Sequence, residues 1–103
     1  DIVARYETWG RDLRPLGLSI REIRMSPRGG WRLKTVGANG PLTVELGRDE
    51  PDERFARFVS AHARTLGALA RAGTRVESVD LRYRNGFAAR IPGFREKATR
   101  PAA

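Results

Sequence analysis

The amino-acid sequence predicts an α+β fold, in which an antiparallel-rich, mixed β-sheet carries two α-helices and ends in a C-terminal β-hairpin. Three observations predict this class. Apolar residues recur at helical spacing in two segments, residues 2–16 and 51–72. Three runs of alternating apolar and polar residues, separated by turns, occupy residues 18–46. Two further short alternating runs surround Asn85-Gly86.

The first helix is predicted from apolar residues three or four positions apart. Pro15 and Gly17 are expected to end it, because proline lacks the donor that a helix interior needs and glycine favours a helix end. The apolar positions of this helix are Ile2, Val3, Tyr6, Trp9, Leu13 and Leu16.

Three strands should follow as an antiparallel meander. The stretch "LSIREIRMS" changes its alternation between Ile20 and Ile23, which indicates a strand with a β-bulge. The turns "PRGG" and "GANGP" separate it from "WRLKTV" and "LTVEL". The inward-facing residues of the last two strands are expected to be Trp31, Leu33, Leu42, Val44 and Leu46.

The second helix begins in "GRDEPDERF", where Asp49 is the expected N-cap and Pro51 suits the first turn. Glu50, Asp52 and Glu53 add negative charge near the positive end of the helix dipole. Gly73 should end the helix. One apolar stripe should face the core, made of Phe55, Phe58, Val59, His62, Leu66 and Leu69.

A three-residue loop, Arg84-Asn85-Gly86, is the register that we predict for the terminal hairpin, because it keeps all the apolar residues on one face. On the other face, Asp80 would lie opposite Arg90 as a favourable cross-strand pair. The apolar pairs would be Tyr83 with Phe87, Leu81 with Ala89, and Val79 with Ile91.

The strand from Phe87 to Ile91 is expected to be the last one and to form an edge of the sheet. An edge can be blunted, or it can accept a strand from a partner, and the sequence leaves both open. We divide the chain into one domain, residues 1–93, and a flexible tail, residues 94–103. Because the chain opens at Asp1 without a methionine, we expect it to be a piece of a longer protein.

The composition favours a soluble domain with anionic partners. The formal net charge is +8, which suits nucleic acid, anionic lipid or an acidic protein surface. No apolar run approaches the roughly 20 residues of a membrane-spanning helix. The chain has no cysteine, so disulfide and thiolate chemistry are excluded.

The sequence offers little for catalysis. His62 is the single histidine and lies in the apolar stripe of the second helix, where a packing role is expected. With one histidine and no cysteine, a zinc site would need several carboxylates. Phosphate-binding glycine motifs are missing as well. We therefore predict no enzyme, and no catalytic, metal-binding or cofactor-binding residue.

A nucleic-acid-binding module is an alternative. "NGFAAR" partly matches an RNA-recognition-motif signature, which has Gly86, Phe87 and Ala88 in place. That signature needs an aromatic residue where Ala89 stands and an apolar residue where Arg90 stands. The order of the predicted helices and strands also differs, so the base-stacking surface would be missing.

Four stretches resemble the FtsQ family of bacterial cell-division proteins: "VDLRYRNGFAAR" at 79–90, "RFARFV" at 54–59, "SPRGGWRL" at 26–33 and "VELGR" at 44–48. They fall in the order and spacing of that family, and the resemblance covers about residues 1–93. One departure is His62-Ala63, where the family often has an aromatic residue followed by proline.

The resemblance implies a non-enzymatic scaffold of the division machinery. Proteins of this family have one transmembrane helix in the inner membrane, a periplasmic POTRA domain and then a periplasmic β domain. The present chain resembles most of that β domain, without the anchor, the POTRA domain and the first β-strand. The family links early and late proteins at the division septum and binds the FtsB–FtsL pair, where an FtsB segment adds a strand to the last strand of the β domain.

The resemblance also implies site residues. Tyr83 matches a signature tyrosine for FtsB binding, and Asn85 and Gly86 match the turn beside the added strand. Arg28 matches an arginine that pairs with an acidic residue of FtsB, and Arg82 is a weaker candidate on the polar face. Mainly backbone hydrogen bonds are expected from Phe87, Ala88, Ala89 and Arg90.

A third possibility is a POTRA-associated module of the outer-membrane assembly or secretion type. It would bind a β-barrel or secreted partner and not FtsB.

Overall fold

The computed structural model describes residues 2–38, 40–84, 86–92 and 97–99. Its helical elements are α1 (Ile2–Leu13), the 3₁₀ turn η1 (Arg14–Leu16), α2 (Pro51–Ala61), the π-helical turn η2 (His62–Leu66) and α3 (Gly67–Arg71). Its strands are β1 (Ser19–Met25), β2 (Trp31–Gly37), β3 (Gly40–Gly47), β4 (Ser78–Asp80), β5 (Phe87–Arg90) and β6 (Lys97–Thr99). Within these ranges, no helix has the length and apolar character needed to cross a bilayer.

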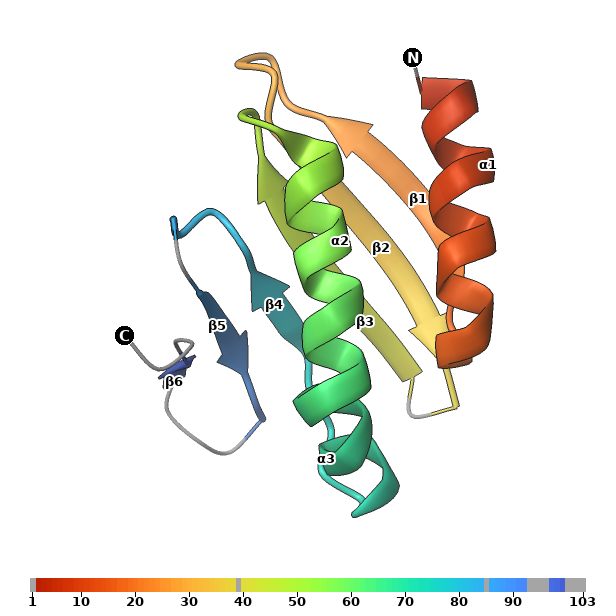
Figure 1. Ribbon diagram of the computed structural model, residues 1–103, viewed down its shortest axis with the longest axis vertical. Helices are drawn as coiled ribbons and strands as arrows, with labels where there is room; N and C mark the ends of the chain where they lie inside the picture. The colour runs from red at the N-terminus through yellow and green to blue at the C-terminus, as the bar shows by residue number, and fades with distance from the viewer. Residues whose placement is uncertain (1, 39, 85, 93–96, 100–103) are drawn as a thin grey trace.

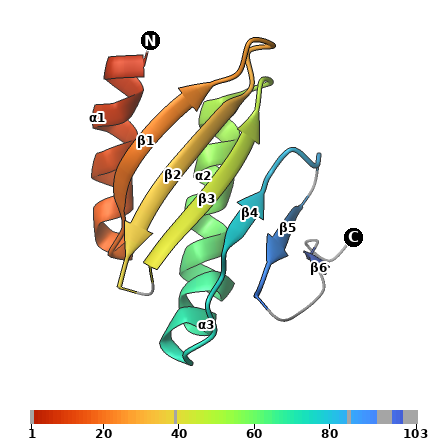
Figure 2. The ribbon, with the colours of Figure 1, turned by 180° about the vertical axis from the view of Figure 1, so that it is seen from behind.

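The strands form one mixed sheet in the order β1-β2-β3-β4-β5-β6, and the helices lie on one of its faces (Figures 1 and 2). The predicted α+β class is confirmed. The predicted meander of β1, β2 and β3 is also confirmed, and its bulge falls between Ile20 and Glu22. Strand β4 pairs with β3 in parallel. A parallel pair needs a crossover, which the continuous run α2-η2-α3 supplies.

The core lies between the sheet and the helices. Trp9 of α1 stacks on Phe55 of α2 with ring centroids 4.8 Å apart, and its edge meets Trp31 of β2 at 5.8 Å. The predicted inward residues of β2 and β3 are buried, as are Phe58 and Leu66 of the second helical run. Phe55 is buried as well, and the remaining members of that stripe, Val59, His62 and Leu69, are half-buried.

Two helix details differ from the sequence prediction. Asp49 does not cap α2, because Glu50 takes the N-cap position in a left-handed conformation and no side chain caps the helix. On α1, only Trp9 and Leu13 of the predicted apolar positions are buried. Ile2, Val3 and Tyr6 are exposed because α1 runs along the margin of the sheet and meets the core with its C-terminal half (Figure 1).

The predicted register of the terminal hairpin is wrong by two residues. Val79 pairs with Ala89, and Asp80 pairs with Ala88, so neither meets the partner expected for it. Leu81 continues along β3, where its amide donates to the carbonyl of Glu45 at 2.8 Å. Residues 81–86 therefore form the connection, which is longer than the predicted three-residue loop. Because the shift is an even number, Val79, Leu81 and Ala89 keep the predicted core face.

The predicted edge is also different. Strand β5 is not the edge of the described sheet, because β6 pairs with it antiparallel, with Ala88 opposite Ala98 and Ala89 opposite Lys97. Strand β6 was not predicted because its three residues, "KAT", are too few to show the alternating pattern on which strand prediction depends.

Candidate partner-binding surface

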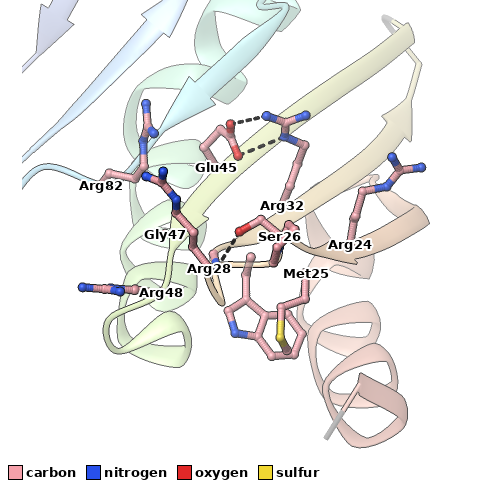
Figure 3. Close-up of a pocket in the computed structure, with 12 residues that line it drawn as sticks. Arg24, Met25, Ser26, Arg28, Arg32, Glu45, Gly47, Arg48 and Arg82 are labelled. Carbon is pink, nitrogen blue, oxygen red and sulfur yellow. Dashed lines mark hydrogen bonds and ion pairs between the residues drawn. The ribbon is translucent and has the colours of Figure 1, made fainter.

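An open groove of about 560 Å³ lies on the sheet near the turn between β1 and β2 (Figure 3). It contains five arginines and one glutamate, and we call it the arginine groove. Its lining comes from three separate parts of the chain: Arg24, Met25, Ser26, Pro27, Arg28, Gly30, Trp31 and Arg32; then Glu45, Gly47 and Arg48; and finally Arg82.

Strand periodicity puts these charges on the open face of the sheet. Leu33 and Val44 are fully buried and face the helices. Their neighbours Arg32 and Glu45 are paired across β2 and β3 and point to the opposite face. This is the polar phase of two strands whose apolar phase builds the core.

A tight turn presents Arg28 at one side of the groove. The amide of Gly30 donates to Ser26 Oγ at 2.9 Å, and the amide of Gly29 donates to the carbonyl of Ser26 at 2.8 Å. Gly29 has a φ of +88°, which a residue with a side chain adopts only with strain. Arg28 is exposed on this turn.

The charges in the groove are only partly paired. Arg32 donates two hydrogen bonds to Glu45, at 3.0 and 2.8 Å, and these bonds with the carboxylate charge raise the pKa of Arg32. Within the part of the chain that the structure describes, Arg28 and Arg48 have no hydrogen-bond or ion-pair partner. The groove is therefore positively charged and has two guanidinium groups available to an anionic partner.

Arg82 is held in the groove by Asp80. Its side chain donates to both carboxylate oxygens, at 2.9 and 2.7 Å, and its amide donates to Asp80 Oδ1 at 3.0 Å. Burial raises the pKa of Asp80. The hydrogen bonds from Arg82 and the charges of Arg82 and Arg54 outweigh that effect and leave the pKa below its ordinary value. Asp80 is thus ionised and ends strand β4 with a side-chain-to-backbone turn.

The connection from Leu81 to Gly86 carries the predicted tyrosine. Leu81 is fully buried, whereas Tyr83 is 47% exposed. The prediction that Tyr83 faces Phe87 across the hairpin is therefore wrong. Gly86 is buried, and its carbonyl and that of Tyr83 both accept from Arg57 of α2. Asn85 lies outside the described residues.

Strand β5 contributes mostly backbone. Ala88 and Ala89 are buried, Phe87 is half-buried against the core, and Arg90 is exposed. Because two of the four side chains are methyl groups, recognition along this strand would depend on its N–H and C=O groups.

The structure brings Arg28 and Arg82 together in one groove, although they are distant in sequence. It places Tyr83 beside Arg82 in the connection and Phe87 to Arg90 in the strand that follows. The sequence prediction missed Arg24, Arg32 and Arg48. The alternation of β2 indicates that Arg32 lies on the polar face of the strand. It does not distinguish a binding surface from an ordinary solvated face, which has the same pattern.

The single histidine and the acidic side chains were the residues to examine for a metal centre. Among the described residues, no group of three or more His, Asp or Glu side chains is placed to hold a metal ion. His62 packs against Phe58 with ring centroids 6.0 Å apart. Burial, and then the positive charge of Arg71, lower the pKa of His62.

The sequence matches a family model described as the C-terminal part of the cell division protein FtsQ/DivIB, over residues 1–82. The cell division protein FtsQ of Allochromatium vinosum is 41% identical over 87 residues, which cover 84% of this chain and 32% of that protein. The FtsQ protein of Burkholderia pseudomallei is 37% identical over 99 residues, covering 92% and 37%. That of Nitrosospira multiformis is 36% identical over 90 residues, covering 87% and 36%. The chain spans about one third of the length of these relatives.

Proposed function

The chain belongs to the FtsQ/DivIB family of cell-division proteins, and we propose that it is the partner-binding domain of a non-enzymatic divisome scaffold. In this proposal the domain binds the FtsB–FtsL pair and links early and late division proteins. The complete protein would be anchored in the inner membrane by a single span, with this domain in the periplasm at the division septum.

The observation that carries the proposal is the arginine groove beside the exposed tyrosine. Arg28 has no ion-pair partner among the described residues, and Arg82 lines the same groove one residue before Tyr83. A partner with an acidic side chain and a tyrosine-binding surface would contact all three. Opposite charge on the partner would also speed association, an effect that salt screens.

Strand addition at β5 is the second part of the proposal. We propose that a segment of FtsB pairs with β5 in the position that β6 occupies in the free chain. The pairing of β6 supports this part of the proposal. The backbone of Phe87 to Ala89 already pairs with an antiparallel strand on that side of β5. The partner would therefore displace β6 when it binds.

A titration with the periplasmic FtsB segment of the same organism tests the groove. We expect Arg28→Gln to weaken binding about fivefold to tenfold, the loss of one interfacial charge contact. Arg28 suits the test because its removal leaves no described carboxylate without a partner. Arg21→Gln is the matched control, because Arg21 is exposed on β1 and does not line the groove.

Two results would contradict the proposal. One is the absence of saturable binding by wild-type chain that circular dichroism shows to be folded. The other is an equal loss of affinity in Arg28→Gln and Arg21→Gln at low salt, since that would reflect net charge and not a site.

Nucleic-acid binding is the second candidate, because five arginines in one groove also suit phosphate groups. The aromatic side chain in the groove, Trp31, is only 6% exposed and offers little surface for base stacking. A titration with a single-stranded oligonucleotide separates the candidates. Tight binding with a steep salt dependence, without binding of the FtsB segment, would favour nucleic acid.

A further inference from the structure

The connection between β4 and β5 is fixed to the second helix by one side chain. Arg57 lies on α2, and its Nη1 donates to the carbonyl of Tyr83 at 2.9 Å and to the carbonyl of Gly86 at 3.4 Å. The first bond is short and well formed, and the second is long. A single guanidinium nitrogen therefore contacts the backbone on both sides of position 85.

This contact acts on the part of the connection that the core does not hold. Leu81 anchors the start of the connection, because its side chain is fully buried and its amide is bonded to Glu45. Phe87 anchors its end in β5. Between them, the residues from Arg82 to Arg84 are exposed. The carbonyl of Tyr83 is turned toward α2 by Arg57, while its ring remains 47% exposed.

We propose that Arg57 is a positioning residue for partner binding, which holds the connection in the shape that presents Tyr83 and the start of β5. The inference rests on the proposed function, and Arg57 itself is not assigned a contact with the partner. Its effect would be to raise the fraction of chains that are ready to bind. Apparent affinity is proportional to that fraction, so removing Arg57 would weaken binding.

Arginine suits this role better than lysine. Its guanidinium is planar, so the two hydrogens of Nη1 point in fixed directions and each can be donated to one of the two carbonyls. Hydrogen bonds from a charged donor are stronger than neutral ones. Arg57→Lys should therefore keep part of the effect, whereas Arg57→Met should lose all of it.

The first test is a titration of the 103-residue chain with the FtsB segment. Arg57→Met should weaken binding about tenfold, which corresponds to the loss of one charge-assisted hydrogen bond, and Arg57→Lys should be intermediate. Arg64→Met is the matched control, because Arg64 is exposed on the same helical run and has no partner among the described residues. Urea unfolding of each variant shows whether it remains folded.

A double-mutant cycle separates positioning from a general loss of structure. If Arg57 acts through Tyr83, then adding Arg57→Met to Tyr83→Ala should cost much less than tenfold. Adding Arg57→Met to Arg28→Gln should lower the affinity for the FtsB segment by the full tenfold, because Arg28 belongs to a different turn. Equal costs in both backgrounds would overturn the positioning role.

Hydrogen exchange of the free chain tests the clamp without the partner. The amides of Leu81 and Arg82 donate to the carbonyl of Glu45 and to Asp80 Oδ1 at the start of the connection, and they should exchange faster in Arg57→Met than in wild type, while the amides of the β2–β3 pair remain unchanged. Unchanged exchange at these two amides would overturn the clamp itself. Absence of binding by wild type would instead refute the proposed function, and the positioning role with it.

Discussion

At the scale of single residues, one carboxylate decides where the last hairpin begins. Asp80 accepts from the amide of Arg82 at 3.0 Å and from its guanidinium group at 2.9 and 2.7 Å. These bonds end strand β4 and turn the chain, so Tyr83 leaves the sheet. A cross-strand pair of Asp80 with Arg90 was the reasonable sequence prediction. Asp80 pairs with Arg82 instead, because a partner two residues away needs no ordering of a second strand.

Gly47 is a residue on which the arginine groove depends. It has a φ of +75°, and an added Cβ would lie 2.9 Å from Arg54 Nη1 and 3.1 Å from Arg82 Cγ. We expect Gly47→Ala to lower the free energy of unfolding by about 1–3 kcal/mol and to displace Arg82. Urea unfolding measures the first effect, and titration with the FtsB segment measures the second.

Gly17→Ala is the control for backbone strain. Gly17 has nearly the same φ, +76°, and no atom lies within 4 Å of an added Cβ. It should show the strain of a positive φ without the clash. An equal loss of stability in the two variants, with unchanged FtsB binding, would show that the groove does not need the close approach at Gly47.

His62 makes stability depend on pH. Its pKa in the folded chain is lowered below the ordinary value of 6.5, so the folded state prefers the neutral ring. The unfolded chain therefore binds the proton first as the pH falls. The stabilisation is fully present above pH 6.5 and is lost as the pH falls through the folded pKa.

His62→Gln should remove this dependence. We expect urea unfolding to show wild type losing more stability than the variant between about pH 7.5 and pH 5.5. The carboxylates are the same in both chains. Parallel pH profiles for the two chains would contradict the pKa assigned to His62.

At the scale of elements, β6 covers the strand proposed for partner binding. Removal of residues 93–103 deletes β6 and leaves β5 without that neighbour. We expect the shortened chain to bind the FtsB segment ~3- to 10-fold more tightly, because no internal strand has to be displaced first. Titration of both chains measures the ratio. Unchanged or weaker binding would mean that β6 does not compete with the partner.

The elements differ in how far the sequence predicts them. The meander and the first parts of both helices follow from patterns of five or more residues, and these predictions are confirmed. Strands β4 and β6 have three residues each, which is too short for alternation to determine register. The register of β4 depends instead on its parallel pairing with β3, across a crossover that no local pattern reveals.

The candidate site was predictable only in part, because a local pattern does not show which distant residues the fold brings together. Arg28 and Arg82 could be named individually from the family resemblance, but their meeting in one groove is a property of the fold. Arg57 could not be recognised, because an arginine that bonds to two carbonyls and an arginine in solvent have the same spacing on a helix.

At the scale of the whole molecule, the sheet separates the hydrophobic core from the arginine groove. One face carries the helices and the core, and the other carries the arginine groove (Figures 2 and 3). The proposed strand site is near the end of the sheet opposite to β1. A partner could thus place acidic side chains in the groove and pair its backbone with β5 without disturbing the core.

The central claim is that an FtsB strand pairs with β5, and disulfide scanning tests it most directly. The chain has no cysteine, so Arg90→Cys provides a single thiol on an exposed position of β5. Cysteines are placed one by one along the FtsB segment, and the cross-linked yield is measured. Arg21→Cys on β1, at the opposite edge, is the control.

The account predicts cross-links to Arg90→Cys at every second position of a short stretch of FtsB. Side chains of a paired strand alternate between faces, and only those facing the same way come within disulfide range. Uniform yields along the segment, or cross-links that favour Arg21→Cys, would contradict strand addition at β5.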